Sequence, residues 1–476
     1  MNIQSDVSVS RPVQPWRYFW WLVIVVVVGW QSVICVRACW HTNPQDVSDF
    51  TAFYGAGRLA LRGENIYDFK HSNISRRPYL YPPTFAVFPM MPLALLSHNA
   101  ALIVFVAINQ ALLFGVFWML RDALWRWVPQ TSPPAIYGSA WQRWLRHPDS
   151  GMMLAAVICF RFVDNNLRHG NANMFVAFGI TLGLWLMLQN RRPWREFSSG
   201  VAIALATAIK VTPGLFGLYL LWTWRKRGMV GGALGLVFFL LLVPALPMGF
   251  SQAIARLKEY KAHIASAATG EDAEQDPIGH EGGADQKQLE GGISLRGSLT
   301  RYLTPKPMHF KDKLYYANIV DWPETTVRRI CQILEFLLFG ATVFLTARKV
   351  ARSDLAGIAL SWGLIATAML LISPLTRKAH LCALLIPAAV AIALMQQDRI
   401  CGWARTLCIS ALAATCLQGV VFSVNFIGKL NSDWVQMMGI GFWMLLGVYF
   451  GLAVALWKLE PLGKTADVFE IDGNVR

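Results

Sequence analysis

Long apolar runs alternate with short polar connectors along nearly the whole chain, which has 476 residues. Runs of about 17 to 25 apolar residues are long enough to cross a hydrocarbon core about 30 Å thick as α-helices. In lipid, such a segment must satisfy its own backbone hydrogen bonds. The pattern therefore predicts an all-α polytopic membrane protein with about 12 transmembrane helices.

The loops between the predicted spans set their orientation, because short cytoplasmic loops are rich in Lys and Arg. Arg11 and Arg17 place the N-terminus inside, and the first span is expected to be a retained helix, not a cleaved signal. The continuous spans are predicted at residues 17–39, 98–120, 151–163, 172–189, 229–248, 329–347, 355–373, 379–396, 404–426 and 437–457.

Residues 197–224 need a different solution, because basic clusters flank them on both sides and both clusters favour the cytoplasm. A single crossing cannot place both flanks on one side. Two short helices broken at Lys210 and Pro213 can, since proline lacks an amide donor and disfavours helix at the residue before it. We expect a half-length hairpin, which completes the count of spans.

Two long extracytoplasmic loops follow from this topology within a single domain of residues 1–476. The first, residues 40–97, is expected to contain a small juxtamembrane helix that starts at Asp49 and stops at Gly63. Four prolines within 11 residues then predict a rigid, irregular re-entry to the membrane. The second loop, residues 250–328, contains a Gly-rich acidic stretch that we expect to be mobile.

Composition supports the membrane class and excludes others. The chain is 55% hydrophobic and only 15% charged, against about 25% charged in an ordinary soluble domain. The net charge of +15 comes from short basic clusters between apolar segments, which favours topology signals over nucleic-acid binding. The 8 cysteines show neither a disulfide framework nor zinc-ligand spacing. No metal or cofactor is predicted.

Polar and ionisable residues near the membrane gather on the predicted outer side, where they mark a candidate site. They comprise Asp46, Asp49, Tyr54, Tyr67, Asp68, Tyr79 and Tyr81 in the first loop, Arg161, Asp164, Arg168, His169, Asn171 and Asn173 between two spans, Arg296 and Arg301 in the second loop, Arg377, Lys378 and His380 before a later span, and Lys210 at the helix break.

Each candidate also has an ordinary structural interpretation. Asp49 could simply cap its helix or act as a reactive carboxylate. Arg377 and Lys378 could extend to the interface, although external cations oppose the charge rule and so favour a bound anion. The same anion argument applies to Arg296 and Arg301, although they lie in a long loop and long loops escape the charge rule. Lys210 could cap the carbonyls that the helix break exposes.

Four blocks of this sequence resemble glycosyltransferase family 87, the polyprenyl-phosphate-mannose-dependent mannosyltransferase group of the GT-C superfamily. They are "DFTAFYGAGRLALRGENIYD" with the following "YLYPPTFAVFPMMPLALL", then "HGNANMFVAFGITLGLWL", "GVAIALATAIKVTPGLFGLYLLWTWRKR" and "SPLTRKAHLCALLIP". The resemblance implies a GT-C fold, in which juxtamembrane helices of the first extracytoplasmic loop cover a cavity and that loop supplies the catalytic Asp. Asp49 occupies this position.

The sequence departs from the family pattern at two places. Gly170-Asn171-Ala172-Asn173 stands where the family usually has Gly-Gln-x-Asn, and Arg377, Ala379 and His380 replace the Trp and paired His of a later block. A lipid-phosphate leaving group departs as an anion, so one base suffices, unlike the two carboxylates of glycosidases. Asp49 would remove the acceptor's proton while the cations stabilise the phosphate.

The resemblance therefore implies an inverting, integral membrane hexosyltransferase of the cell envelope, with a polyprenyl-phosphate donor, a lipid or glycan acceptor and no nucleic-acid partner. Mannose is the expected sugar, and the bacterial inner (plasma) membrane is the expected location, with the active site on the extracytoplasmic side. The alternative is a lipid-linked saccharide flippase or transporter, which also needs a cationic cavity. A third reading is an assembly scaffold without a substrate.

Overall fold

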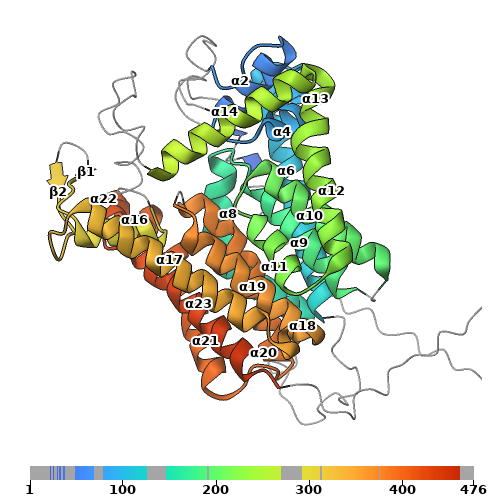
Figure 1. Ribbon diagram of the computed structural model, residues 1–476. Coiled ribbons are helices and arrows are strands. Elements are labelled where there is room, and N and C mark those ends of the chain that lie inside the picture. Colours follow the sequence, from blue (N-terminus) through green and yellow to red (C-terminus); the bar gives the residue numbers. More distant parts are fainter. Residues whose placement is uncertain are drawn as a thin grey trace, which may run out of the picture.

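The computed structural model describes residues 49–68, 79–125, 146–189, 192–269, 292–310, 313–374 and 376–460, with a few positions between 22 and 37. Most of the predicted first span, Asp46 and the acidic stretch at residues 270–291 lie outside these residues. The described chain is built almost entirely of helices (Figure 1). The prediction of an all-α polytopic membrane architecture is confirmed.

The first half contains α2 (Asp49–Leu61), α4 (Pro83–Phe85), the π-helix η1 (Ala86–Met90), α5 (Met91–Leu93), α6 (His98–Trp125), α8 (Pro148–Arg168), α9 (Asn173–Leu188), α10 (Pro193–Ile209), α11 (Gly214–Trp222), α12 (Lys226–Val237), the π-helix η2 (Phe238–Leu242), α13 (Val243–Met248) and α14 (Phe250–Thr269).

The second half contains α16 (Leu295–Leu303), β1 (Met308–Phe310), β2 (Lys313–Tyr315), α17 (Glu324–Thr346), α18 (Lys349–Ser353), α19 (Leu355–Ile372), the 3-10 helix η4 (Lys378–Leu384), α20 (Leu385–Gln396), α21 (Gly402–Cys416), the π-helix η5 (Leu417–Val421), α22 (Val424–Met437) and α23 (Ile440–Lys458). The two strands form a small antiparallel hairpin that pairs Met308 with Tyr315.

Seven helices in the described part of the chain are long and apolar enough to cross a membrane. They comprise α6, α12 with η2 and α13, α17, α19, η4 with α20, α21 with η5, and α23. The shorter α9 has 16 residues, or about 24 Å of helix, less than a full hydrocarbon core. The total of about 12 spans stays a prediction, as does the single domain.

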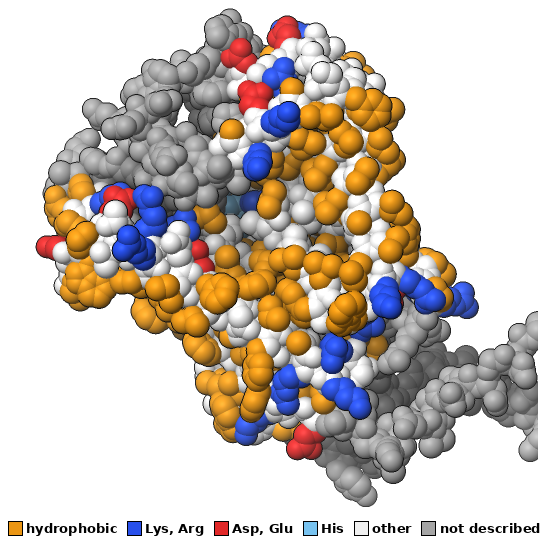
Figure 2. All heavy atoms as spheres, viewed as in Figure 1, with side chains coloured by type: hydrophobic (Ala, Val, Ile, Leu, Met, Phe, Trp, Pro, Cys, Tyr) orange, Lys and Arg blue, Asp and Glu red, His pale blue; other side chains and the backbone are white. Residues whose placement is uncertain are grey.

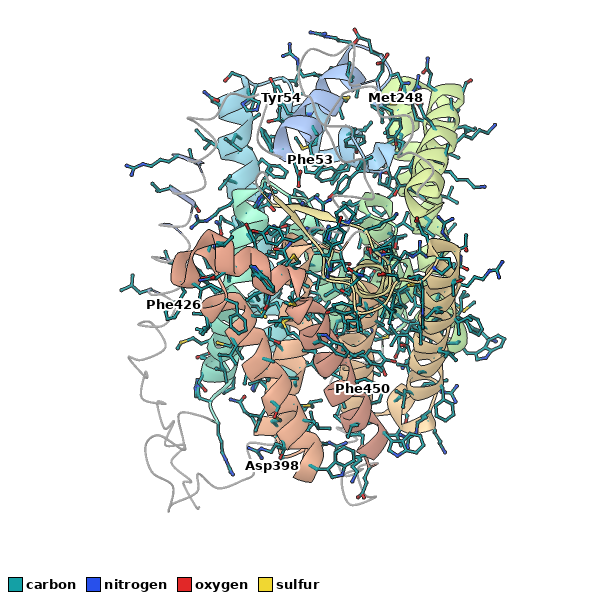
Figure 3. All side chains as sticks on the ribbon, turned by 90° about the vertical axis from the view of Figure 1, so that its left-hand side faces the viewer. Phe53, Tyr54, Met248, Asp398, Phe426 and Phe450 are labelled. Carbon is teal, nitrogen blue, oxygen red and sulfur yellow. The ribbon has the colours of Figure 1, made fainter. Side chains whose placement is uncertain are left out.

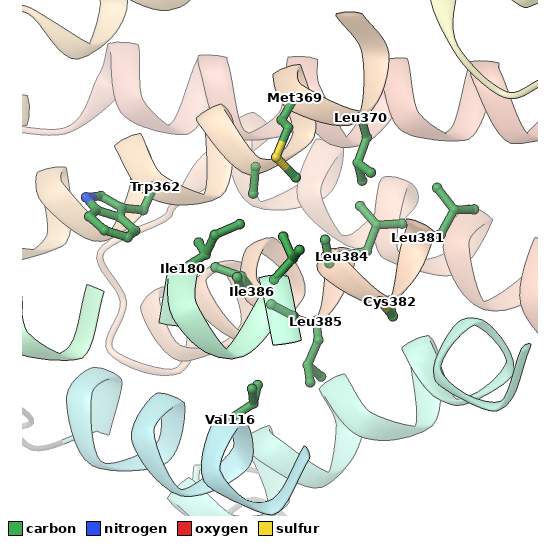
Figure 4. Close-up of a cluster of buried hydrophobic side chains, with 14 of the residues drawn as sticks. Val116, Ile180, Trp362, Met369, Leu370, Leu381, Cys382, Leu384, Leu385 and Ile386 are labelled. Atoms are coloured by element: carbon green, nitrogen blue, oxygen red, sulfur yellow. The ribbon is translucent and has the colours of Figure 1, made fainter. Parts of the chain in front are cut away.

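Burial separates the central helices from those at the rim. In α19, and in η4 with α20, 89% of the most apolar 18-residue stretch is buried, whereas in α17 only 17% of that stretch is buried. Figure 4 shows Trp362, Met369 and Leu370 of α19 facing Ile180 of α9 and the residues around Leu384 and Ile386. The helices that carry the candidate site thus rest on a packed centre, while α17 presents its apolar side chains outward.

The break predicted between residues 197 and 224 is present. α10 ends at Ile209, Lys210 is extended with φ −151° and ψ 131°, and α11 begins at Gly214 directly after Pro213. α10 also packs closely against α12: a Cβ added at Gly231 would lie 2.0 Å from the Phe197 carbonyl oxygen. Such small-residue contacts let membrane helices approach at backbone distance.

The first loop contains the expected juxtamembrane helix, since α2 spans Asp49–Leu61 and Gly63 adopts φ +70° after it. The proline-rich re-entry is more helical than predicted. It forms α4, η1 and α5, because Pro83 and Pro92 each occupy the first turn of a helix, where a missing amide costs nothing. Thr84 Oγ1 donates to the Phe239 carbonyl of η2 at 2.8 Å, which ties the re-entry to the membrane helix beside it.

Two other expectations need correction. The third span, predicted at residues 151–163, is the longer helix α8, because the polar residues after Phe160 continue the helix by pairing with one another. The second loop is also more ordered at its ends than a loop of residues 250–328 suggests. α14 begins at Phe250, and α16 and the β1–β2 hairpin also lie inside the range predicted as the second loop. α17 already begins at Glu324.

The two ends of the bundle differ in character. Figure 3 places Tyr54 and Met248 at one end and Asp398 at the other. At the Asp398 end, Arg225 donates to the Arg352 carbonyl at 2.6 Å and Arg348 donates to the Trp457 carbonyl at 2.7 Å. Figure 2 shows basic side chains gathered at this lower end and apolar side chains over the flank above it.

Candidate active site

The start of α2 meets the end of α8. The Asp49 amide donates to the His169 carbonyl oxygen at 3.1 Å. Gly170 follows with φ +58°, and a Cβ there would lie 2.7 Å from Phe50 Cβ, so both the backbone conformation and the close approach require glycine. This junction brings the first loop against residues more than 100 positions later in the chain.

Four polar side chains form a continuous network at this junction. Asn171 Nδ2 donates to Asp49 Oδ2 at 2.7 Å, and Tyr81 Oη donates to Asn171 Oδ1 at 3.2 Å. Lys210 Nζ lies 5.8 Å from the centre of the Tyr81 ring, within the range of a cation–π contact. We call Asp49, Asn171, Tyr81 and Lys210 the Asp49 network.

Lys210 reaches the network because of the break between α10 and α11. Its extended backbone ends α10, and Nζ donates to Asn173 Oδ1 at 3.1 Å. Asn171 and Asn173 therefore hold the carboxylate and the ammonium from the same short turn. The sequence predicted all five of these residues as candidates, and the structure brings them together.

Burial and the negative charge of Asp49 raise the pKa of Tyr81, which lies in the first loop. The phenol therefore stays protonated at neutral pH and remains a donor to Asn171. Cys382 of η4 also interacts electrostatically with Tyr81 and with Lys210. Cys382 is not among the predicted site residues, although it lies inside the block "SPLTRKAHLCALLIP".

A second polar cluster surrounds Asp164, which is 1% exposed. Arg161 Nη1 donates to one carboxylate oxygen at 2.6 Å, and Arg168 Nε donates to the other at 2.8 Å. Lys378 of η4 interacts electrostatically with Arg161 and with Asp433 of α22. Arg161 and Arg168 thus share one buried carboxylate in the last turns of α8, and Asp433, beside Lys378, is a neighbour that no sequence pattern indicated.

The other residues of the block at 373–387 have local roles. The Arg377 amide donates to His380 Nδ1 at 2.9 Å, so this imidazole caps the start of η4. The Arg377 side chain is exposed. Figure 2 shows a hollow in this face of the molecule, with blue and pale-blue side chains, Lys or Arg and His, inside it.

Arg296 and Arg301 belong to the junction of α16 with its neighbours. Arg296 Nη2 pairs with Glu335 of α17 at 3.1 Å, and Arg301 Nη2 donates to Ser298 Oγ at 3.0 Å. Burial lowers the pKa of Arg301 to about 10, so it stays charged at neutral pH. These contacts give both residues a packing role, and their predicted role in phosphate binding stays a prediction.

Tyr54 and His169 also have defined partners. Tyr54 Oη donates to the Leu96 carbonyl at 2.9 Å, and its ring packs edge-on against His98. His169 Nδ1 lies 2.8 Å from the Asn165 carbonyl and the side chain is exposed. Their predicted place in a substrate cavity stays a prediction. No group of three or more His, Cys, Asp or Glu among the described residues could hold a metal ion.

These features define a polytopic helical membrane protein in which a buried amide joins a partly buried carboxylate and a partly buried ammonium near one end of the bundle. Residues 79–275 match the model of glycosyltransferase family 87. This is the family that the four sequence blocks resemble.

A polyprenol-phosphate-mannose-dependent alpha-(1-2)-phosphatidylinositol mannoside mannosyltransferase of Mycolicibacterium smegmatis is 28% identical to this chain over 218 residues. The match covers 44% of this chain and 45% of that relative, so the chain spans less than half the length of the curated relative.

Two solved structures are also similar, ArnT from Cupriavidus metallidurans bound to undecaprenyl phosphate and the same protein in the apo state. Each is 16% identical, and the match covers 92% of this chain and 76% of ArnT, with TM-scores of 0.40 and 0.39.

The arrangement of Asp164 predicts a structural role for its carboxylate. Asp164→Asn removes the negative charge between Arg161 and Arg168, and losing hydrogen bonds to charged groups costs about 1.5–3 kcal/mol. We expect a lower midpoint of thermal unfolding in detergent and a reduced yield of folded protein. The exposed Asp321→Asn variant should unfold like the parent. Unchanged stability together with lost turnover would instead identify Asp164 as the reactive carboxylate.

Proposed function

We propose that this chain is an integral membrane glycosyltransferase that transfers a hexose, with mannose as the first candidate, from a polyprenyl-phosphate donor to a hydroxyl of a lipid or glycan acceptor. The observation that carries the proposal is the Asp49 network, in which a buried amide holds one carboxylate 2.7 Å away at the edge of the membrane bundle. The family and the mannosyltransferase relative support the donor class.

The proposed reaction needs one base. Asp49 removes the proton from the acceptor hydroxyl, and the acceptor oxygen attacks the anomeric carbon from the face opposite the phosphate. The bond between that carbon and the phosphate oxygen breaks, and both of its electrons leave with the polyprenyl phosphate. Because the leaving group is already a stable anion, no general acid is required, and the configuration at the anomeric carbon is inverted.

The departing phosphate requires positive charge. Lys378 of η4 and Arg161 of α8 are close enough to interact electrostatically, and Lys210 lies within the Asp49 network. Cations that are fixed before the reaction stabilise developing negative charge without reorganisation. The polyprenyl tail would remain in the bilayer, so the protein needs no fold for a soluble nucleotide sugar.

We further propose that the site faces the extracytoplasmic side of the bacterial plasma membrane. The basic connectors around Arg225, Arg348 and Arg399 support a cytoplasmic position for the opposite end. A reporter fused after residue 70 should then be active only outside the cytoplasm, and one fused after residue 227 only inside. Reversal of either result would contradict this orientation.

Asp49→Asn tests the reaction directly. A general base contributes about 10² to 10⁴-fold in rate, so turnover should fall at least a hundredfold. The amide oxygen of Asn can still accept from Asn171, so stability and donor binding should stay close to the parent. Turnover is measured with a labelled polyprenyl-phosphate hexose, and donor binding is measured separately at equilibrium.

Asp46→Asn serves as the control for Asp49→Asn and should keep most activity. If Asp49→Asn keeps near-parental turnover, Asp49 is not the base. A flippase or transporter would instead move the lipid-linked sugar across vesicles without releasing polyprenyl phosphate, and its activity would follow a gradient.

The phosphate assignment is tested with Lys378→Ala and Arg377→Ala. Each should weaken donor binding, and Lys378→Ala should do so by about 10- to 100-fold, because a hydrogen bond to a charged group contributes about 1.5–3 kcal/mol. The effect of Arg377→Ala should be smaller, since that side chain is exposed and screened by salt. Lys261→Ala, on the exposed side of α14, is the control. If both variants bind the donor as tightly as the parent protein, the block at residues 373–387 has a structural role and does not bind the donor phosphate.

A further inference from the structure

Asn171 is held from both sides within the Asp49 network. Its Oδ1 accepts from Tyr81 Oη at 3.2 Å while its Nδ2 donates to Asp49 Oδ2 at 2.7 Å, and the residue is 7% exposed. A carboxylate can only accept hydrogen bonds. Rotation of the amide by 180° would therefore place oxygen against oxygen, so the contact with Asp49 fixes the amide in one orientation.

The backbone around Asn171 is equally constrained. Its amide donates to the Asn166 carbonyl at 3.1 Å, and the neighbouring His169 carbonyl accepts from the Asp49 amide at 3.1 Å. The left-handed Gly170 joins these two contacts. Asn171 and Asp49 are thus held together by main-chain bonds that do not depend on either side chain, so a change of the Asn171 side chain leaves the junction of α2 and α8 in place.

Tyr81 holds the amide from the other side and is itself fixed. Its ring packs edge-on against Phe53 at 4.9 Å, and Lys210 lies over it at 5.8 Å. The groups that interact with the Asp49 carboxylate therefore come from three elements: the 169–171 turn, the re-entry of the first loop and the break after α10.

We propose that Asn171 is the positioning residue of the reaction: its Nδ2–H donates to one oxygen of Asp49 and thereby sets the angle at which the carboxylate meets the acceptor hydroxyl. Asn171 itself transfers no proton. The inference rests on the proposed function, because it needs Asp49 as the base. Misplacement of a catalytic group by about 1 Å can cost about a hundredfold in rate. Loss of the Asn171 side chain should therefore reduce turnover more than it weakens donor binding.

The test compares three substitutions of Asn171 in the purified full-length protein, with a labelled polyprenyl-phosphate hexose as the probe. Asn171→Ala should lower kcat by about 10- to 100-fold, the range expected for a hydrogen bond to a charged group, with donor affinity within about threefold of the parent. Asn171→Asp, of the same shape but with a carboxylate facing a carboxylate, should be at least as slow. Asn171→Gln restores an amide donor and should recover part of the loss.

A double-mutant cycle separates positioning from a structural role. In the Asp49→Asn background there is no charged base left to position, so adding Asn171→Ala should cause no further loss beyond about twofold. The matched control is Asn431→Ala, an exposed asparagine of α22 whose side chain donates to the Ile427 carbonyl, and it should match the parent in every measurement.

The inference is overturned if Asn171→Ala turns over like the parent, if it loses the same factor in both backgrounds, or if its defect lies in folded yield or donor affinity alone. Asp49→Asn reports on the proposed function separately. If that variant keeps parental turnover, the assignment of the base fails and the positioning role fails with it, whereas an inactive Asp49→Asn beside a fully active Asn171→Ala rejects the positioning role alone.

Discussion

A charge near the hydrocarbon core is stable only when other polar groups satisfy it, and this requirement organises the candidate site. The Lys210 ammonium donates a hydrogen bond to Asn173, and Asp164 accepts hydrogen bonds from two guanidinium groups. Asp49 accepts a hydrogen bond from Asn171. Each of these contacts joins the end of α8 or the turn after it to another polar group. The turn at residues 169–173 is therefore the structural centre of the site, since it holds both the carboxylate and the ammonium.

Asp164 and Asp49, both predicted as site residues, have different surroundings in the structure. Asp164 is enclosed by Arg161 and Arg168 and is almost fully buried, which suits a residue that neutralises and orients cations. Asp49 instead lies at the start of a juxtamembrane helix and accepts from a neutral amide. Asp49 as the proposed single base, beside several cations, matches the chemistry of a leaving group that departs as an anion, and this asymmetry favours transfer over hydrolysis by a pair of carboxylates.

Much of the fold could be predicted because it depends on local signals. Basic flanks and Pro213 predicted the break at Lys210, and the helix-like pattern from Asp49 to Gly63 predicted α2. The pairs of Asp164 with Arg161 and Arg168 have helical spacings of three and four residues. The extension of α8 to Arg168 could therefore have been predicted from the sequence, although we predicted a shorter span. The pairing of Arg296 with Glu335 was not, because it joins residues 39 positions apart in two helices whose docking no local pattern specifies.

The proposed reaction is the transfer of a sugar from a lipid phosphate by one inverting displacement. The direct measurement is to incubate the purified protein with a polyprenyl-phosphate hexose, labelled in the sugar, and a membrane extract of the source organism, and to determine free polyprenyl phosphate and the anomeric configuration of the labelled product. We expect equal amounts of released polyprenyl phosphate and new glycoside, with the configuration opposite to that of the donor. Retention of configuration, or labelled donor that crosses the membrane chemically unchanged, would contradict it.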